Sequence, residues 1–216
     1  HMVWLWVDLS ASMAFRSRAA AGSKRDRALV LLLALTELLS TAGERVGLLG
    51  DGEPIIARNA AERLAETLSR LPSRPAVPDP RPLRRFADVV LIGDFFDPLD
   101  DLEAIFTTVA RSGTRAHLIQ VVDPVEETFP YAGRVEFRDP ETGDRHVLGR
   151  AELYRDEYLA MFARRREWLV NLTRRLDWTY LVHRTDRPAT EPLLALHARL
   201  ADRHSRMAMF SGGRAA

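Results

Sequence analysis

An apolar segment followed by oxygen-bearing side chains is the feature that most constrains the fold of this chain. Residues 3–7 are all apolar, and two of them are Val and two are Trp. Such a run is typical of a strand buried on both faces, as in a parallel sheet covered by helices. The polar side chains that follow it are Asp8, Ser10 and Ser12. Asp8 is therefore predicted at the carboxyl end of a strand, where open α/β sheets bind ligands.

The side chains after this strand offer only oxygen donors, which suit Mg²⁺, Mn²⁺ or Ca²⁺ and exclude a thiolate zinc site. A second apolar segment, 89–92, leads to Gly93 and Asp94. If the two strands are neighbours, Asp8 and Asp94 meet at one sheet edge. The alternative is that Asp8 and Ser10 merely cap the next helix. The buried strands before both aspartates favour the metal site.

Length and composition predict a single domain of ordinary size, over residues 3–210. The formal net charge is +1, so no overall field favours nucleic acid or an anionic membrane. The chain has no cysteine, no signal pattern and no apolar run long enough to span a bilayer. Residues 1–2 resemble a cloning scar before a core strand. We expect a cytoplasmic domain that was cut from a longer natural chain. Whether the upstream part holds a membrane anchor stays an open question at this point.

The spacing of apolar residues predicts strands that alternate with helices, and hence a mostly parallel sheet. Strands are expected at 3–7, 45–49, 54–57, 88–93, 116–122 and 178–183. Helices are expected at 27–39, 60–71, 102–109, 152–176 and 191–204. Residues 134–137 and 146–148 flank a turn sequence, which predicts an inserted β-hairpin near 134–149. Residues 72–82 hold five prolines and are predicted to form an irregular loop.

Two families share these features. Residues 7–13, Val-Asp-Leu-Ser-Ala-Ser-Met, resemble the first metal-site segment of von Willebrand factor A domains, and residues 91–95, Leu-Ile-Gly-Asp-Phe, resemble their later aspartate strand. Through residues 43–49 and 123–143 the chain more narrowly resembles the bacterial family catalogued as domain of unknown function 58. The resemblance implies a doubly wound α/β sheet of order 3-2-1-4-5-6 with one antiparallel edge strand.

The resemblance also implies a function. Asp8, Ser10 and Ser12 would hold Mg²⁺ or Mn²⁺ with Asp94, directly or through water. Two neutral hydroxyls leave the ion electrophilic, so that its open position can take an acidic residue of a protein partner. Members of the narrower family look like companions of MoxR-type AAA+ ATPases in complex assembly or maturation. A complete site adds a threonine before the Asp94 strand, and residues 72–82 contain none, which predicts a weak or empty site without millimolar metal.

Two alternatives remain open beside this protein-binding module. One is a metal-dependent hydrolase that uses Asp8 and Asp94, and the other is a structural domain with a vestigial site. We expect no enzyme, because no histidine lies near either motif in sequence and no nucleophile or phosphate-loop motif is present.

Several other charged groups have simpler interpretations. The aspartates that follow the second strand, Asp97, Asp100 and Asp101, are expected to form a turn and a helix cap. A second acidic group is either a partner surface shared with the hairpin or a solvated rim, and its members are Asp123, Glu126, Glu127 and Glu141. Lys24 is the only lysine, which we interpret as a codon-composition bias. Residues 164–166, three arginines, are expected on a solvated helix face.

Overall fold

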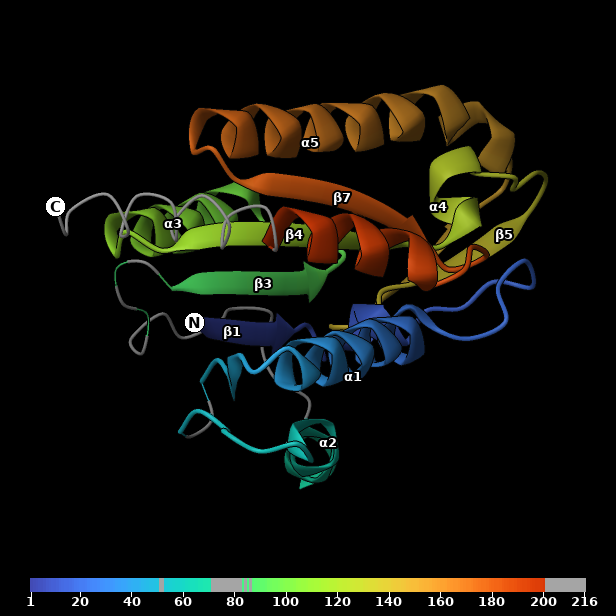
Figure 1. Ribbon diagram of the computed structural model, residues 1–216. Coiled ribbons are helices and arrows are strands. Elements are labelled where there is room, and N and C mark those ends of the chain that lie inside the picture. Colours follow the sequence, from blue (N-terminus) through green and yellow to red (C-terminus); the bar gives the residue numbers. More distant parts are fainter. Residues whose placement is uncertain (51–52, 71–82, 84, 86, 201–216) are drawn as a thin grey trace, which may run out of the picture.

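The computed structural model describes residues 1–200 apart from 51–52, 71–82, 84 and 86. Its centre is a five-stranded parallel sheet of order β2-β1-β3-β4-β7 (Figure 1). The strands are β1 (Met2–Val7), β2 (Arg45–Leu48), β3 (Asp88–Gly93), β4 (Arg115–Val122) and β7 (Thr179–Arg184). This is the predicted α/β fold with the predicted strand order.

The antiparallel edge strand predicted at 54–57 is reduced to one bridge. Val46 of β2 and Ile55 exchange both backbone hydrogen bonds, at 3.3 and 2.6 Å. Since Ile55 forms the hydrogen-bonded pair, the backbone nitrogen of Pro54 points away from β2, which suits a proline at a sheet edge. The turn predicted just before it falls on residues 51–52, outside the described part of the chain.

Helices cover both faces of the sheet (Figure 1). One face carries α1 (Lys24–Thr41), α2 (Ala60–Arg70) and the helical residues 190–200, and the other carries α3 (Leu99–Arg111) and α5 (Arg155–Arg175). The end predicted for the last helix, at residue 204, lies outside the described residues.

α1 starts three residues earlier than the apolar pattern predicted. The Ser23 hydroxyl accepts the backbone N–H of Asp26 at 3.0 Å, and the Asp26 carboxylate accepts that of Ser23 at 2.9 Å. This reciprocal capping box satisfies two of the free donors at the helix start. It therefore places Lys24 in the first turn of α1.

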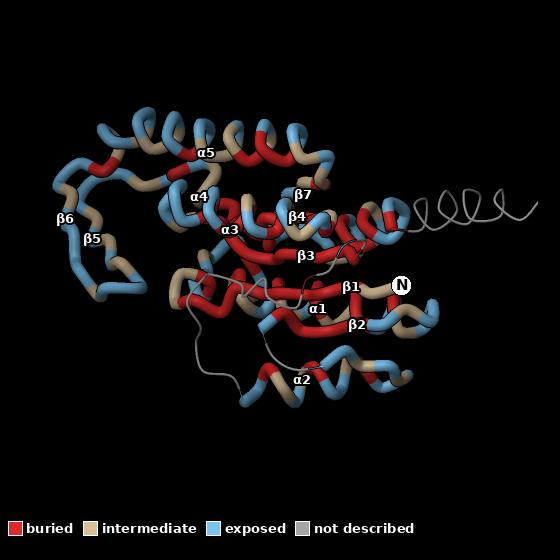
Figure 2. Tube along the Cα trace, turned by 90° about the vertical axis from the view of Figure 1, so that its left-hand side faces the viewer, coloured by how far each residue is buried: buried red, intermediate tan, exposed pale blue. Residues whose placement is uncertain are grey.

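β1 divides the core into two parts. Val3, Leu5 and Val7 pack with the helices on the α1 face, whereas Trp4 and Trp6 pack with α3 and α5. Alternate side chains of a strand point to opposite faces, so an uninterrupted apolar run is buried on both. Figure 2 shows the inner strands β1, β3 and β4 almost entirely in the buried colour.

A two-stranded hairpin, β5 (Val135–Arg138) and β6 (Arg145–Leu148), is inserted between β4 and β7 as predicted. Three short helices lie along the chain next to these strands. η1 (Ala11–Ala14) follows β1, α4 (Pro124–Thr128) precedes the hairpin and η2 (Ala151–Tyr154) follows it. The ring of Phe137 stacks on that of Phe129 with centroids 5.8 Å apart. The hairpin projects beyond the carboxyl ends of the strands (Figures 1 and 2).

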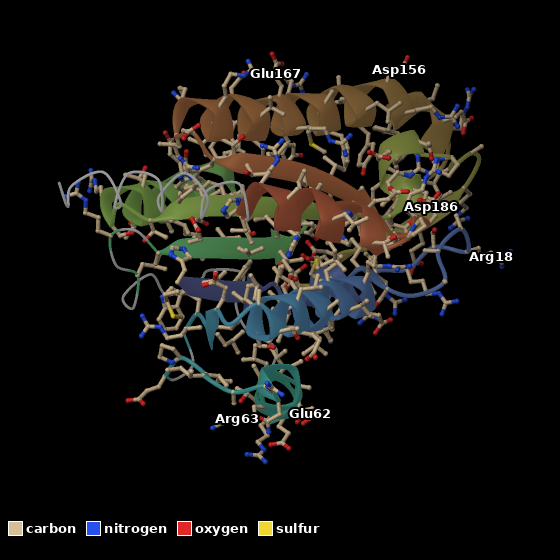
Figure 3. The ribbon with its side chains drawn as sticks, viewed as in Figure 1. Arg18, Glu62, Arg63, Asp156, Glu167 and Asp186 are labelled. Carbon is tan, nitrogen blue, oxygen red and sulfur yellow. The ribbon has the colours of Figure 1, made fainter. Side chains whose placement is uncertain are left out.

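Charged side chains lie mainly on the outside of the two helical layers. Figure 3 shows Glu62 and Arg63 on α2, and Asp156 and Glu167 on α5, pointing away from the sheet. Among the residues described, no helix has the length and apolar character needed to cross a membrane.

Candidate metal centre

Asp8 and Asp94 meet at the carboxyl edge of β1 and β3, because these two strands are neighbours in the sheet. The backbone N–H of Asp8 donates to the carbonyl of Ile92 at 2.8 Å, which continues the pairing of the two strands. A Cβ added to Gly93 would lie only 3.0 Å from the Cβ of Asp8. Glycine therefore leaves the space in which the buried Asp8 side chain sits.

The two serines join the aspartates in one hydrogen-bonded cluster. The Ser10 N–H donates to Oδ1 of Asp8 at 2.8 Å, and the hydroxyl oxygens of Ser10 and Ser12 lie 3.0 Å apart. The Ser12 hydroxyl donates to Oδ2 of Asp94 at 3.1 Å. Ser10 precedes η1 but its side chain makes no capping bond, which argues against a simple cap. The structure thus brings together all four residues singled out from the sequence.

The spacing of these oxygens fits a hard divalent cation. An octahedral ion with ligands at 2.0–2.1 Å holds neighbouring ligand oxygens about 3.0 Å apart. The distance of 3.0 Å between the hydroxyl oxygens of Ser10 and Ser12 matches this value. Within the described residues, no three His, Asp or Glu side chains gather as a metal group. A cation here would therefore depend on the serine hydroxyls.

The electrostatics of Asp8 also favour a cation. Burial raises the pKa of Asp8 to about 6, and the nearby Asp94 carboxylate raises it as well, against the lowering effect of the Ser10 hydrogen bonds. A buried carboxylate beside another one is costly when ionised. A positive charge between Asp8 and Asp94 would remove that cost.

Lys24 supplies part of the positive charge from within the chain. Its side chain is 1% exposed, and its Nζ donates to Oδ2 of Asp94 and to Oε1 of Glu126, each at 2.7 Å. Burial alone would lower the pKa of Lys24, but the two carboxylates raise it above its ordinary value. The interpretation of Lys24 as a result of codon bias overlooked this buried ion pair. The one sign of it in the sequence was that Lys24 is the only lysine of the chain.

The four residues of the second acidic group lie in different environments. Asp123 is buried and begins α4, where it accepts the backbone N–H groups of Val125 and Ser17. The remaining members each have a separate partner. Glu126 pairs with Lys24, Glu127 with Arg166, and Glu141 with the backbone N–H of Ser12.

A cavity of about 570 Å³ separates the site from the hairpin. Ser10, Ser12 and Asp94 line one side, and the hairpin lines the other with His146 and Glu141 among its residues. Sequence reasoning found no histidine near the motifs, because His146 is far from both in the chain. The hairpin brings it to the cavity.

Arginines hold the two loops that carry the site. Arg25 donates to the carbonyls of Leu9 and Ser10 at 3.1 and 2.9 Å. Arg165 donates to the carbonyls of Phe95 and Asp97. The three arginines at 164–166 were expected on a solvated face, whereas Arg165 and Arg166 are half-buried and bound.

The aspartates that follow β3 fall in two environments. Asp100 and Asp101 lie in the first turn of α3, as the helix-cap interpretation expects. Asp97 instead lines the cavity, and its pKa is raised by burial and by Asp94. The loop that lacks the expected threonine, residues 72–82, lies outside the described residues.

A family profile described as protein of unknown function DUF58 matches residues 1–168 of the chain. The uncharacterized proteins Mb1516 of Mycobacterium bovis and Rv1480 of Mycobacterium tuberculosis are each 30% identical over 201 residues. These matches cover 85% of this chain and 62% of each relative, so the chain spans less than two thirds of their length.

The fold is also similar to solved structures. A crystal structure of an aerotolerance-related membrane protein from Bacteroides fragilis matches 93% of this chain and 98% of its own, with a TM-score of 0.50 and 15% identity. A conserved hypothetical protein BatB from Bacteroides thetaiotaomicron matches with a TM-score of 0.47 and 14% identity. At this identity the likeness of the first shows a shared fold alone.

Proposed function

Because this chain belongs to the DUF58 family of proteins of unknown function, we propose its function from its own site: a protein-binding module that uses a divalent cation. The observation that supports the proposal is the convergence of Asp8, Ser10, Ser12 and Asp94 in one hydrogen-bonded cluster, with the two serine hydroxyl oxygens at a spacing suited to an octahedral ion. Such a site is similar to that of von Willebrand factor A domains.

The excess of carboxylates supports a bound cation. Lys24 pairs with Asp94 and Glu126, and Asp8 lies near Asp94. When these four groups are ionised, two negative charges remain among them, and Mg²⁺ or Mn²⁺ would offset this excess. Buried charges of one sign are costly unless they are paired.

The four residues have different roles in this proposal. Asp8, Ser10 and Ser12 would hold the cation. Both oxygens of Asp94 already accept hydrogen bonds, Oδ1 from the Phe96 N–H and Oδ2 from Ser12 and Lys24. Asp94 is therefore assigned to a cation-bound water rather than to the ion.

A bound ion would supply an open position for an acidic residue of a partner. Mg²⁺ prefers oxygen ligands and exchanges only some of its waters for protein groups. The neutral Ser10 and Ser12 hydroxyls leave the ion more electrophilic than carboxylates would. The cavity of about 570 Å³ gives an incoming side chain room.

A MoxR-type AAA+ ATPase is the partner class that we propose from the family resemblance. Binding should need Mg²⁺ or Mn²⁺ and be lost in EDTA. We expect a pull-down with such an ATPase to succeed in millimolar Mg²⁺ and to fail after chelation. Capture that is equal under both conditions would contradict a metal-dependent interface.

Titration calorimetry with Mn²⁺ tests the site directly. We expect EDTA-treated protein to bind Mn²⁺, and Asp8→Asn to lose at least about tenfold in affinity, because a charged ligand becomes neutral. Asp100→Asn removes the same charge from the exposed first turn of α3 and should change nothing. If the unaltered protein does not bind Mn²⁺, the result would favour the alternative of a structural domain with a vestigial site.

His146 favours a metal-dependent hydrolase as the second candidate. It lies on β6 and lines the cavity opposite Asp94 and the serines, where a general base would face a metal-bound water. Turnover of p-nitrophenyl phosphate in Mn²⁺, lost in His146→Gln, would favour this candidate. No turnover together with intact Mn²⁺ binding would favour the binding module.

A further inference from the structure

The hairpin already places a carboxylate at the candidate metal centre. Oε1 of Glu141 accepts the backbone N–H of Ser12 at 2.8 Å, and the hydroxyl of the same Ser12 is one of the proposed cation ligands. Ser12 and Glu141 are 129 positions apart in the chain. The contact therefore comes from the position of the hairpin and not from local sequence.

The turn of the hairpin holds Glu141 in this orientation. Oδ1 of Asp139 accepts the backbone N–H groups of Glu141 at 2.8 Å and Thr142 at 3.2 Å. Phe137, on β5 two positions before Asp139, contacts the rings of Phe129 and Tyr131. This strand of the hairpin is thus packed on the protein, whereas Glu141 in the turn that follows is exposed.

The carboxylates around the cavity disfavour an outside carboxylate beside Glu141. Asp94, Asp97 and Asp139 line the same cavity, and Glu141 is among the carboxylates that raise the pKa of Asp97. An acidic side chain that entered beside Glu141 would add a negative charge to this group. An acidic side chain that replaced Glu141 would leave the number of charges unchanged.

We propose that Glu141 is an internal stand-in for the partner's acidic residue, so that the β5–β6 hairpin closes the metal centre until a partner displaces its tip. This inference rests on the proposed metal-dependent function. An exposed turn that follows a packed strand is the feature expected of a segment that opens locally. Closure lowers the apparent affinity for outside carboxylates by the fraction of molecules that are open.

The test uses Mn²⁺-loaded protein and N-acetylglutamate methylamide as a probe of the acidic side chain. We expect Glu141→Ala to bind the probe about tenfold more tightly than the unaltered protein, since a charge-assisted hydrogen bond no longer competes. Glu136→Ala is the matched control. Its carboxylate lies on the same hairpin, 3.5 Å from Arg145 and half exposed, and its removal should leave probe binding unchanged.

Hydrogen exchange of the Ser12 amide in metal-free protein gives a second, independent measurement. Exchange should be faster in Glu141→Ala and unchanged in Glu136→Ala. Equal probe affinity in all three Mn²⁺-loaded proteins, or a Ser12 amide unaffected by Glu141→Ala, would overturn the closure while leaving the metal site in place. Failure of every protein to bind Mn²⁺ would overturn the proposed function and, with it, the stand-in role.

Discussion

The Nζ of Lys24 lies 2.7 Å from Oδ2 of Asp94, the same oxygen that accepts the Ser12 hydroxyl. The protein therefore holds a cation of its own beside the site predicted for a metal. Lys24 also binds Glu126, whose other carboxylate oxygen accepts the N–H of Asp123. The ammonium thus connects the end of β3 to α4 and holds the cluster together without a metal ion.

Lys24→Met should destabilise the protein strongly in EDTA. Removal of the ammonium leaves Asp94 and Glu126 buried without a counter-charge, and breaking such a pair costs about 3–5 kcal/mol. Urea unfolding measures the loss, with Arg164→Met on the exposed face of α5 as the control. Millimolar Mn²⁺ should restore part of the stability. A loss below about 1 kcal/mol in EDTA would show that the pair contributes little.

Asp8→Asn should stabilise the metal-free protein at pH 7.5. Because burial raises the pKa of Asp8 to about 6, the ionised carboxylate costs free energy above that pH. One pKa unit corresponds to about 1.4 kcal/mol, so the gain is on the order of 1–3 kcal/mol. Chemical denaturation in EDTA measures it, and the gain should disappear at pH 4. A variant less stable than the unaltered protein at pH 7.5 would contradict the charge argument.

Gly93→Ala should weaken both Mn²⁺ binding and stability. The new Cβ would lie 3.0 Å from the Cβ of Asp8 at the end of a central strand, which forces one of them to shift. Overpacking of this kind costs about 1–3 kcal/mol. Gly149→Ala is the control, since no atom lies within 4 Å of its added Cβ. Calorimetry with Mn²⁺ that finds equal affinities would show that Asp8 tolerates the shift.

His183 should make the stability depend on pH. Burial lowers its pKa to about 4 and the charge of Arg27 lowers it as well, whereas Asp186 raises it. Between about pH 6.5 and 4 the unfolded chain binds a proton that the folded protein excludes, so the free energy of unfolding falls as the pH falls. His183→Gln should reduce the loss between pH 7 and 5 by about 2 kcal/mol. His146→Gln, on the exposed hairpin, is the control for this denaturant series.

The apolar pattern was enough to predict the buried strands and the place of each aspartate at a strand end, whereas the order of the strands came from the family resemblance. The runs before Asp8 and Asp94 are buried on both faces, and this burial depends on which residue types are consecutive. The edge strand predicted at 54–57 pairs with β2 through one bridge and no further ladder. Patterns of apolar residues indicate which strands are buried. They do not indicate how many backbone hydrogen bonds a strand at the sheet edge forms.

The sequence by itself determined that Asp8, Ser10 and Ser12 follow one buried strand and Asp94 another, because these positions depend on local chain direction. Only the tertiary structure decided what surrounds them. Lys24 reaches Asp94 across 70 positions, and Glu141 reaches Ser12 across 129. Long flexible side chains such as lysine and glutamate can reach many partners. The packing of α1 and of the hairpin against the ends of the strands selects one partner for each.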